Sequence, residues 1–140
     1  MPVVDASVAV AWIVDQTAST PARTLLRAVP NTYVAPAIVL IEAHYAVAKL
    51  IQRGRAAASQ LDDAIPLIAR VADIVPLDRD LASTAGRFSL GAARLGLPHS
   101  FNIYDCAYIA LAARRADTLI TADRGQAAYA ERFGVPVQCL

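Results

Sequence analysis

The sequence predicts a single α/β domain spanning residues 1–140, with a central parallel sheet of about five strands flanked by helices on both faces. Two observations lead to this prediction. Short runs rich in β-branched residues alternate with longer segments of helical character along the whole chain. These short runs are apolar throughout, as in strands that are buried on both faces of a parallel sheet. Since no linker, repeat or low-complexity segment interrupts the alternation, one domain is expected.

The expected strands and helices follow one another in chain order. Strands are predicted at residues 2–6, 32–36, 73–77, 118–122 and 135–140. Helices are predicted at residues 7–16, 19–29, 37–54, 56–72, 79–96, 102–116 and 124–134. A loop is expected at residues 97–101.

Local signals justify the helix boundaries. Ser7 opens the first helix, and a Ser/Thr cap followed by Pro21 in the first turn opens the second. Gly54 closes the third helix, and Asp78 can cap the fifth. Pro66 lies inside the fourth helix, which is therefore expected to kink or divide there.

Composition excludes several classes of protein. The formal net charge is +1, so any polyanionic partner must be bound by a local patch. The start of the chain has no signal-peptide pattern, and no uncharged run reaches the ~18 apolar residues of a membrane span. Two cysteines, Cys106 and Cys139, make neither a disulfide framework nor a zinc site and are interpreted as free thiols of a cytoplasmic protein. The hydrophobic fraction of 56% is compatible with an additional interface.

Four carboxylates are expected at one rim of the sheet, because ligands of open parallel sheets bind beyond the carboxyl ends of the strands. Asp5 follows the first strand and Asp123 the fourth. Asp105 lies in the first turn of a crossover helix that starts at the same rim. Glu42 lies about two turns into the helix after the second strand and extends from the same end.

Three of these residues also have a simpler structural interpretation. Asp5 and Asp123 are each suited to cap the following helix, and Asp105 can form a capping box with Asn102. Taken singly, Asp105 and Asp123 are better explained as caps. Glu42 is different, because its helical neighbours include no cation, and a carboxylate on the buried stripe of a helix is unfavourable unless it is paired or metal-bound.

Taken together, the four carboxylates indicate a divalent cation. Two carboxylates ~5 Å apart repel by roughly 3 kcal/mol at an effective dielectric constant of ~20. Several such pairs would erode a domain stability of only ~5–15 kcal/mol, so either some stay protonated or a cation lies between them. The oxygen-only ligand set fits Mg²⁺ or Mn²⁺. His44 and His99 are isolated, and are expected on a helix surface and in a loop. Lys49, the only lysine, lies two turns from Glu42.

With these residues in place, the chain resembles the PIN-domain family, and within it the VapC-type toxins of bacterial toxin–antitoxin pairs. The matching segments are VVDASVAV at residues 3–10, APAIVLIEA at 35–43, YDCAYIALA at 104–112 and LITADRG at 119–125. Each motif alone is weak, but their order and spacing in a chain of this length are specific. The resemblance covers essentially the whole chain.

The resemblance implies the roles of the site residues. A catalytic and metal-binding quartet is implied, made of Asp5, Glu42, Asp105 and Asp123. Within it, Asp5 and Asp105 are the pair expected to contact Mg²⁺ directly, with Mn²⁺ the other candidate ion. Ser7 and Thr121 match small hydroxyl positions that line the family's site.

The activity that the resemblance implies is metal-dependent endoribonuclease activity, the hydrolysis of phosphodiester bonds in RNA such as tRNA or rRNA. The ion lowers the pKa of a bound water and stabilises charge on the phosphate, and Asp123 or Glu42 is expected to orient that water. The implied partners are a second copy of the chain and a small VapB-type antitoxin that blocks the acidic site.

Arginine side chains are the candidates for contacts with the RNA backbone. Arg124, beside Asp123, is the preferred one. The others are better explained as solvated helix faces: Arg53, Arg55, Arg114 and Arg115. Trp12 and Tyr45 are candidate interface anchors, with core packing an equally good interpretation for Trp12.

Other classes of function stay open as alternatives. A receiver domain or aspartyl-phosphate hydrolase also carries aspartates at the rim of a parallel sheet, but it needs a lysine after a late strand, whereas Lys49 lies in a mid-chain helix. A non-catalytic module that binds a metal or a basic peptide, and a DNA-directed nuclease, are not separated from the ribonuclease by the residues alone.

Overall fold

The computed structural model describes residues 1–28, 33–96 and 102–140. In these residues the chain forms a five-stranded, fully parallel sheet with the strand order β3-β2-β1-β4-β5. The strands are β1 (Val3–Val4), β2 (Tyr33–Pro36), β3 (Ala72–Val75), β4 (Leu119–Thr121) and β5 (Val137–Cys139). The predicted α/β fold class is confirmed, and the three central strands β2, β1 and β4 are buried along their whole length.

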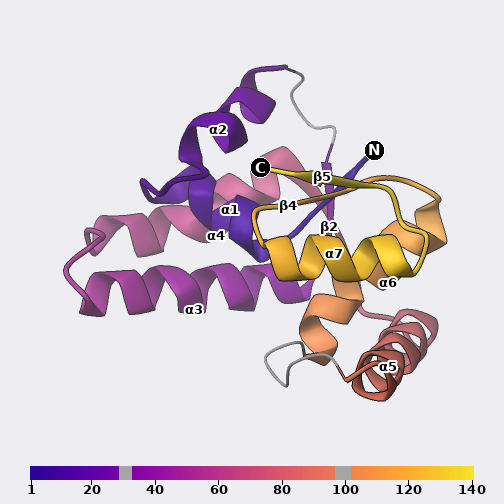
Figure 1. The fold of residues 1–140 in the computed structure, drawn as a ribbon. Coiled ribbons are helices and arrows are strands. Elements are labelled where there is room, and N and C mark those ends of the chain that lie inside the picture. The colour runs from indigo at the N-terminus through magenta and orange to yellow at the C-terminus, as the bar shows by residue number, and fades with distance from the viewer. Residues whose placement is uncertain (29–32, 97–101) are drawn as a thin grey trace.

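Seven helices in the described residues connect and cover these strands (Figure 1). They are α1 (Ala6–Ile13), α2 (Ser19–Ala28), α3 (Ile38–Gln52), α4 (Ser59–Val71), α5 (Arg79–Arg94), α6 (Ile103–Arg115) and α7 (Arg124–Arg132). Helix α1 packs on α2, α3 and α4, whereas α6 packs on α5 and on β1, β2 and β4. Since parallel crossovers are right-handed, the chain covers one face of the sheet on its way to β3 and the other on its way back.

The central strand β1 is the switch point of this topology. It pairs with β2 through Val3 and Val34, and with β4 through Val3 and Leu119 and through Val4 and Ile120. From β1 the successive crossovers lead outward to β2 and β3, and the return crossover lands on β4 at the other side of β1. In such sheets the crevice for a ligand opens beyond the carboxyl ends of the two strands at the switch, here β1 and β4.

The predicted start of the first helix is wrong, and the predicted division of the fourth helix does not occur. Helix α1 begins at Ala6 and not at Ser7, because Asp5 leaves the first strand and caps the helix by accepting a hydrogen bond from the Val8 N–H. Helix α4 runs through Pro66 as one helix, and a kink at Pro66 stays a prediction. Pro66 has no N–H to donate to the Asp62 carbonyl four residues before it. Because Asp62 and Pro66 are both exposed, water can donate to that carbonyl instead.

Of the other local predictions, those for Gly54 and for core packing of Trp12 are confirmed. Gly54 follows α3 with a φ of +67°, a left-handed conformation that suits glycine. Trp12 is a core residue, 4% exposed, and its Nε1 donates a hydrogen bond to the Ala22 carbonyl. His44 is only partly exposed, and its Nδ1 is buried without a hydrogen-bond partner among the described residues, so the surface prediction is wrong for that atom. The predicted loop at 97–101, including His99, lies outside the described residues.

None of the helices in the described part of the chain is both long and apolar enough to cross a membrane.

Candidate active site

Asp5 is the most deeply buried of the four predicted acids, with 2% of its surface exposed. It lies directly after β1 and caps α1. Its Oδ1 accepts hydrogen bonds from Ser7 Oγ at 2.6 Å and from the Val8 N–H at 3.0 Å, and its Oδ2 accepts one from Thr121 Oγ1 at 2.5 Å. Because Val4 of β1 pairs with Ile120 of β4, the residues that follow these two, Asp5 and Thr121, lie beside each other.

The environment of Asp5 disfavours its charge. Burial raises the pKa of its carboxyl group from 3.8 to about 6, although the hydrogen bonds from Ser7 and Thr121 act in the opposite direction. Repulsion from Asp123 adds to the rise. No ion pair of the described residues includes Asp5, so hydroxyl and amide donors are its described partners.

Asp123 caps a helix and Asp105 takes part in a capping box, which are the structural roles that the sequence offers for them. Asp123 caps α7 through Oδ1, which accepts the Gln126 N–H at 3.0 Å. Asp105 and Asn102 form the expected capping box of α6, in which Asp105 Oδ2 accepts the Asn102 N–H at 3.0 Å. Burial, followed by repulsion from Asp123, raises the pKa of Asp105, and the bond from Asn102 opposes that rise. Capping therefore fixes both carboxylates at the same rim without neutralising them.

Glu42 reaches the rim from α3 and is held by a tyrosine of α6. Its Oε2 accepts a hydrogen bond of 2.5 Å from the hydroxyl of Tyr108, which is 1% exposed. Burial raises the pKa of Glu42, the Tyr108 bond opposes this, and repulsion from Asp105 and Asp5 adds to it. The hydrogen bond joins α3, which packs on α1 and α4, to α6, which packs on α5. Sequence reasoning missed Tyr108, although a buried tyrosine always raises the question of where its hydroxyl bonds.

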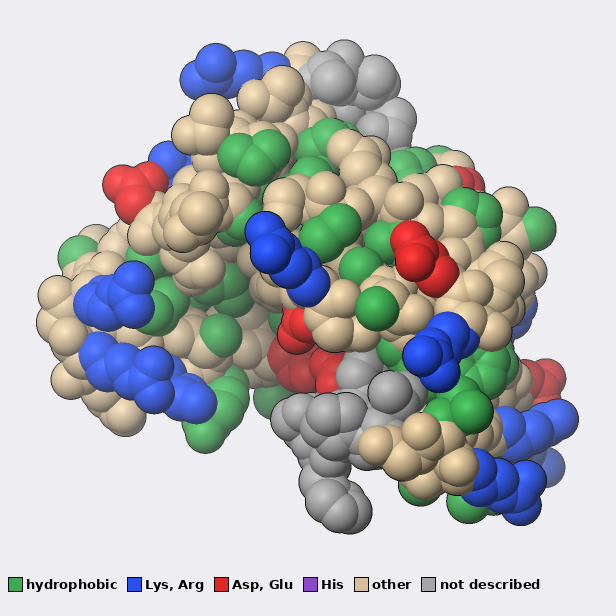
Figure 2. Space-filling view, in the orientation of Figure 1, with side chains coloured by type: hydrophobic (Ala, Val, Ile, Leu, Met, Phe, Trp, Pro, Cys, Tyr) green, Lys and Arg blue, Asp and Glu red, His purple; other side chains and the backbone are tan. Residues whose placement is uncertain are grey.

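The four acids thus form one mutually repelling group around the ends of β1 and β4. The repulsions link Asp5 with Asp123, Asp5 with Glu42, Glu42 with Asp105, and Asp105 with Asp123. Figure 2 shows acidic side chains gathered in a hollow near the centre of one face, with Lys and Arg side chains on the surface around it. Among the described residues, however, no three His, Cys, Asp or Glu side chains are already arranged to hold one ion.

The donor chemistry fits a hard divalent cation. Carboxylate oxygens are the ligands that Mg²⁺ and Mn²⁺ prefer. Burial, with a smaller contribution from neighbouring carboxylates, raises the pKa of three of the four carboxyl groups. In the described hydrogen bonds, each of Glu42, Asp105 and Asp123 accepts through one carboxyl oxygen only. The other oxygen of each remains for an ion or a water.

Ser7 and Thr121 hold the acidic group together from within, as predicted for lining hydroxyls. Besides donating to Asp5, Ser7 Oγ accepts the Ala122 N–H at 2.8 Å, and Thr121 Oγ1 accepts the Asp123 N–H at 2.9 Å. Each hydroxyl therefore ties the loop after β4 to the carboxylate after β1. Their roles in catalysis stay predictions.

Gln126 is a second residue that sequence reasoning missed. It is 3% exposed, its Oε1 lies 3.2 Å from Thr121 Oγ1, and its Nε2 donates to the backbone carbonyl of Asp105 at 3.2 Å. The only sequence signal is its place three residues after Asp123, which is the spacing of an exposed capping box. In the structure its side chain turns inward and joins α7 to the first turn of α6.

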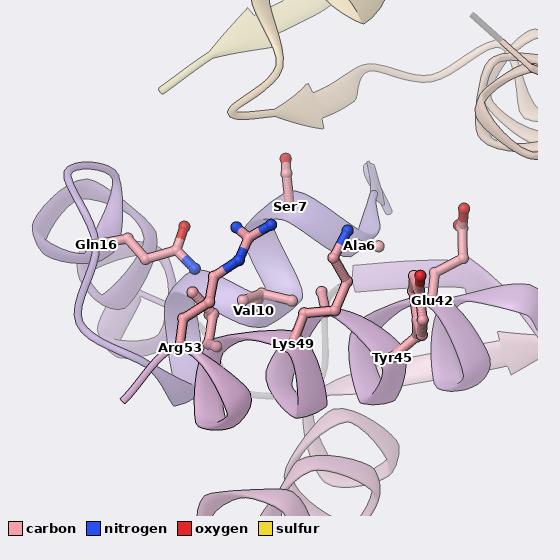
Figure 3. Close-up of a pocket in the computed structure, with 10 residues that line it drawn as sticks. Ala6, Ser7, Val10, Gln16, Glu42, Tyr45, Lys49 and Arg53 are labelled. Atoms are coloured by element: carbon pink, nitrogen blue, oxygen red, sulfur yellow. The ribbon is translucent and has the colours of Figure 1, made fainter. Parts of the chain in front are cut away.

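Two adjoining cavities flank the acidic group on the side of α3. The first, of about 390 Å³, lies between α1 and α3 and is shown in Figure 3. The second, of about 530 Å³, lies beside Asp123 and Arg124. Tyr45, a candidate interface anchor, lines the first cavity and is 65% exposed. Arg124 is exposed in the second cavity beside Asp123, where the sequence places it.

Comparisons with known structures give the same fold. VapC20 of Mycobacterium tuberculosis, described as a toxin that cleaves the sarcin–ricin loop, aligns with a TM-score of 0.72 at 16% identity, over 91% of this chain and 94% of its own. VapBC2 of Rickettsia felis, bound to promoter DNA, aligns at 0.70 and 17%, over 99% and 97%. VapBC-5 of M. tuberculosis, from a toxin–antitoxin system, aligns at 0.62 and 22%, over 99% and 96%.

A search of curated proteins gives no match. The sequence model of the PIN domain, in contrast, matches residues 3–132 and so includes all four acids. A match over this much of the chain, together with the shared fold, establishes that the chain belongs to the PIN-domain family.

Proposed function

We propose that this chain is a divalent-metal-dependent endoribonuclease and acts as the toxin of a toxin–antitoxin pair. One observation carries the proposal: Asp5, Glu42, Asp105 and Asp123 surround the ends of β1 and β4, repel one another, and take part in none of the ion pairs of the described residues. In a PIN-domain chain, such a group suits binding of a hard cation and phosphodiester hydrolysis.

RNA is proposed as the substrate because one structural neighbour, VapC20, is described as cleaving the sarcin–ricin loop. VapBC-5 is described as a member of a family of toxin–antitoxin systems, and a further neighbour, from Klebsiella pneumoniae, as a toxin–antitoxin complex. Both descriptions support a small VapB-type antitoxin as partner. We further propose that residues 1–140 form one PIN domain, that the protein is a cytoplasmic homodimer, and that Arg124 contacts the RNA backbone.

Each acid has a distinct place in the proposed mechanism. Asp5 and Asp105 would contact Mg²⁺ or Mn²⁺ directly, with Glu42 and Asp123 completing the group. The bound ion would supply Lewis-acid stabilisation of the phosphate and a lowered pKa for an attacking water. Asp123 or Glu42 is suited to orient that water, because each keeps one carboxyl oxygen outside the described hydrogen bonds.

The surrounding residues keep these carboxylates in position. Ser7 and Thr121 fix both oxygens of Asp5, and Tyr108 fixes one oxygen of Glu42. Gln126 holds the first turn of α6 through the Asp105 carbonyl. Such hydrogen bonds behind the ligands orient them before substrate binds.

The direct test uses the purified chain freed from any bound antitoxin. It is incubated with tRNA, rRNA fragments and single-stranded DNA in Mg²⁺ or Mn²⁺, with and without EDTA. We expect cleavage of at least one RNA that is abolished by EDTA and by Asp105→Asn, with circular dichroism showing that the variant is folded.

Each alternative function predicts a different result. A folded wild-type chain that cleaves no RNA and no DNA in either metal would favour the non-catalytic binding module. Cleavage of DNA without cleavage of RNA would favour a DNA-directed nuclease.

A further inference from the structure

A stripe of side chains runs along α3 away from the four acids. Glu42, Tyr45, Lys49 and Arg53 are spaced three, seven and eleven residues from the first, which places all of them on one side of a helix with 3.6 residues per turn. Figure 3 shows Tyr45, Lys49 and Arg53 projecting from the same side of α3 towards α1. The stripe therefore begins at a proposed metal ligand and ends with two cations.

The stripe lines a continuous groove. The cavity of about 390 Å³ is lined by all four stripe residues, and the cavity of about 530 Å³ beside it is lined by Arg55, Asp123 and Arg124. The two cavities share Ser7, Gln16 and Leu50 as lining residues. The groove thus leads from Glu42 along α3 and back to Asp123, with basic side chains in both parts.

The cations of the groove have no described acidic partner. The three ion pairs of the described residues involve the amino terminus, Arg23 and Arg114, and none involves Lys49, Arg53, Arg55 or Arg124. Lys49 does not pair with Glu42; its Nζ lies 5.2 Å from the ring centroid of Tyr45. For a chain with a net charge of only +1, this is a marked local surplus of positive charge beside the acids.

Tyr45 supplies a different kind of contact. Its side chain is 65% exposed although it lies in the groove beside Glu42. An exposed aromatic ring next to basic side chains is the arrangement with which proteins bind single strands, because a base stacks on the ring while cations contact the phosphates. The Lys49 ammonium near the ring can strengthen such stacking.

We propose that the α3 stripe is the binding track for a single-stranded segment of the substrate. A base next to the scissile phosphate stacks on Tyr45, and successive phosphates on one side of the cut contact Lys49 and Arg53, which are about 6 Å apart along the helix axis. This inference rests on the proposed ribonuclease function. A cavity of about 390 Å³ is the size of a small-ligand pocket, which suits a single nucleotide better than a duplex.

The first test measures binding separately from cleavage. A fluorescent 12-nucleotide RNA is titrated in an Asp5→Asn background, with Lys49→Ala/Arg53→Ala as the stripe variant and Arg70→Ala/Arg94→Ala, exposed on α4 and α5, as the control of equal charge. Removing two phosphate contacts is expected to weaken binding and to reduce the slope of log affinity against log salt by about 1.4, whereas the control pair leaves the slope unchanged.

Tyr45 is tested in the same binding assay. Tyr45→Ala is expected to weaken binding about fivefold or more, and Tyr45→Phe to retain it, because stacking needs the ring and not the hydroxyl. The same sequence as a duplex is expected to bind less tightly than the single strand. A duplex that binds as tightly, or a Phe variant that fails like the Ala variant, overturns the stacking assignment.

Cleavage assays separate this inference from the function on which it rests. Active chains are compared on the 12-nucleotide RNA and on a small chromogenic phosphodiester that is too short to reach the stripe. The stripe variant is expected to raise the KM for the long strand alone. A stripe variant that binds and cleaves RNA like the wild type would overturn the binding track but leave the ribonuclease proposal intact. A stripe variant that keeps RNA binding but loses binding of a poly-glutamate peptide would identify the groove as a peptide site.

A wild type that cleaves nothing, while the stripe variant still weakens RNA binding, would overturn the ribonuclease proposal but leave the binding track intact.

Discussion

Two aspartates of this chain cap helices in the same way and have opposite electrostatic environments. Asp5 accepts the Val8 N–H at the start of α1, and Asp78 accepts the Leu81 N–H at the start of α5. The pKa of Asp78 is lowered, first by that N–H and then by Arg114, whose guanidinium lies 2.7 Å from Oδ2. The pKa of Asp5 is raised to about 6, because burial outweighs the hydrogen bonds that it accepts.

The difference shows that a capping motif does not determine the burial or the ionic partners of its carboxylate. A carboxylate needed only for its helix can lie in solvent and pair with a cation, as Asp78 does. Asp5 is buried, takes part in none of the described ion pairs and lies near other carboxylates, an arrangement that is unfavourable for folding alone. A pKa raised by burial and by neighbouring carboxylates is typical of functional sites. Substitution of one aspartate, with the same substitution of the other as control, tests whether the two environments have different consequences.

The largest difference is expected in catalysis. Asp5→Asn should lower RNA cleavage by more than ~10²-fold, because even residues that act only behind a metal ligand contribute about 10–100-fold. Asp78→Asn removes the same charge from the same kind of cap and should leave cleavage unchanged. Initial rates at saturating Mg²⁺ measure both. Comparable losses in the two variants would mean that Asp5 acts through the fold and not through the site.

The hydroxyl partner of Asp5 gives the next effect in size. Thr121→Val keeps the shape of a fully buried side chain and removes the hydrogen bond to Asp5 Oδ2. Loss of such a contact should weaken Mn²⁺ binding by about 10–100-fold, since the carboxylate is no longer oriented. Isothermal titration with Mn²⁺ measures it. Thr24→Val on α2, whose hydroxyl donates to the Thr20 carbonyl, serves as control and should bind Mn²⁺ like the wild type.

The pH dependence of stability should separate the two aspartates by sign. The folded chain binds the Asp5 proton more tightly than the unfolded chain, so this group makes the free energy of unfolding fall as pH rises from about 4 to about 6. In EDTA at pH 7, Asp5→Asn should therefore raise the free energy of unfolding by ~1–3 kcal/mol. The upper bound is the pKa change of Asp5 multiplied by the ~1.4 kcal/mol that corresponds to one pKa unit.

Asp78 should behave in the opposite way. Its lowered pKa stabilises the fold above the usual pKa of an aspartate, and that contribution disappears as pH falls below it. Asp78→Asn should thus destabilise the chain slightly at pH 7. Urea denaturation at pH 4 and pH 7 in EDTA measures both variants, and an Asp5→Asn chain less stable than the wild type at pH 7 would contradict the assignment of Asp5.

The sequence predicts local features of this comparison better than long-range ones. The caps at Asp5, Asp78 and Asp123 and the capping box of Asn102 with Asp105 follow from residue types at helix starts. The shared rim follows from the rule for parallel strands. Pro66 misleads because whether a proline divides a helix depends on what surrounds the freed carbonyl, which the sequence does not state.

The missed residues share a physical cause. Tyr108 bonds a glutamate 66 positions away, and Gln126 bonds a carbonyl 21 positions away, so neither pairing leaves a local pattern. Lys49 and Arg53 are ordinary residues of an exposed helix side until α1 packs beside α3 and forms a groove with them. Tertiary packing, and not residue type, decides these roles.

The smallest expected effect concerns the hydroxyl that binds Glu42. Tyr108→Phe leaves the buried ring in place and removes the hydrogen bond to Oε2, so the pKa of Glu42 should rise further and the acid limb of the pH–rate profile should move to higher pH. At pH 7 the loss in kcat should be only a few-fold, in line with the ~0.5–1.5 kcal/mol of a typical hydrogen bond. Tyr129→Phe removes the hydroxyl of another buried tyrosine, which donates to the Phe88 carbonyl, and should leave the profile where it is. A profile that moves in both variants would trace the change to general loosening of α6 and α7; one that moves in neither would mean that Glu42 is held by the cation alone.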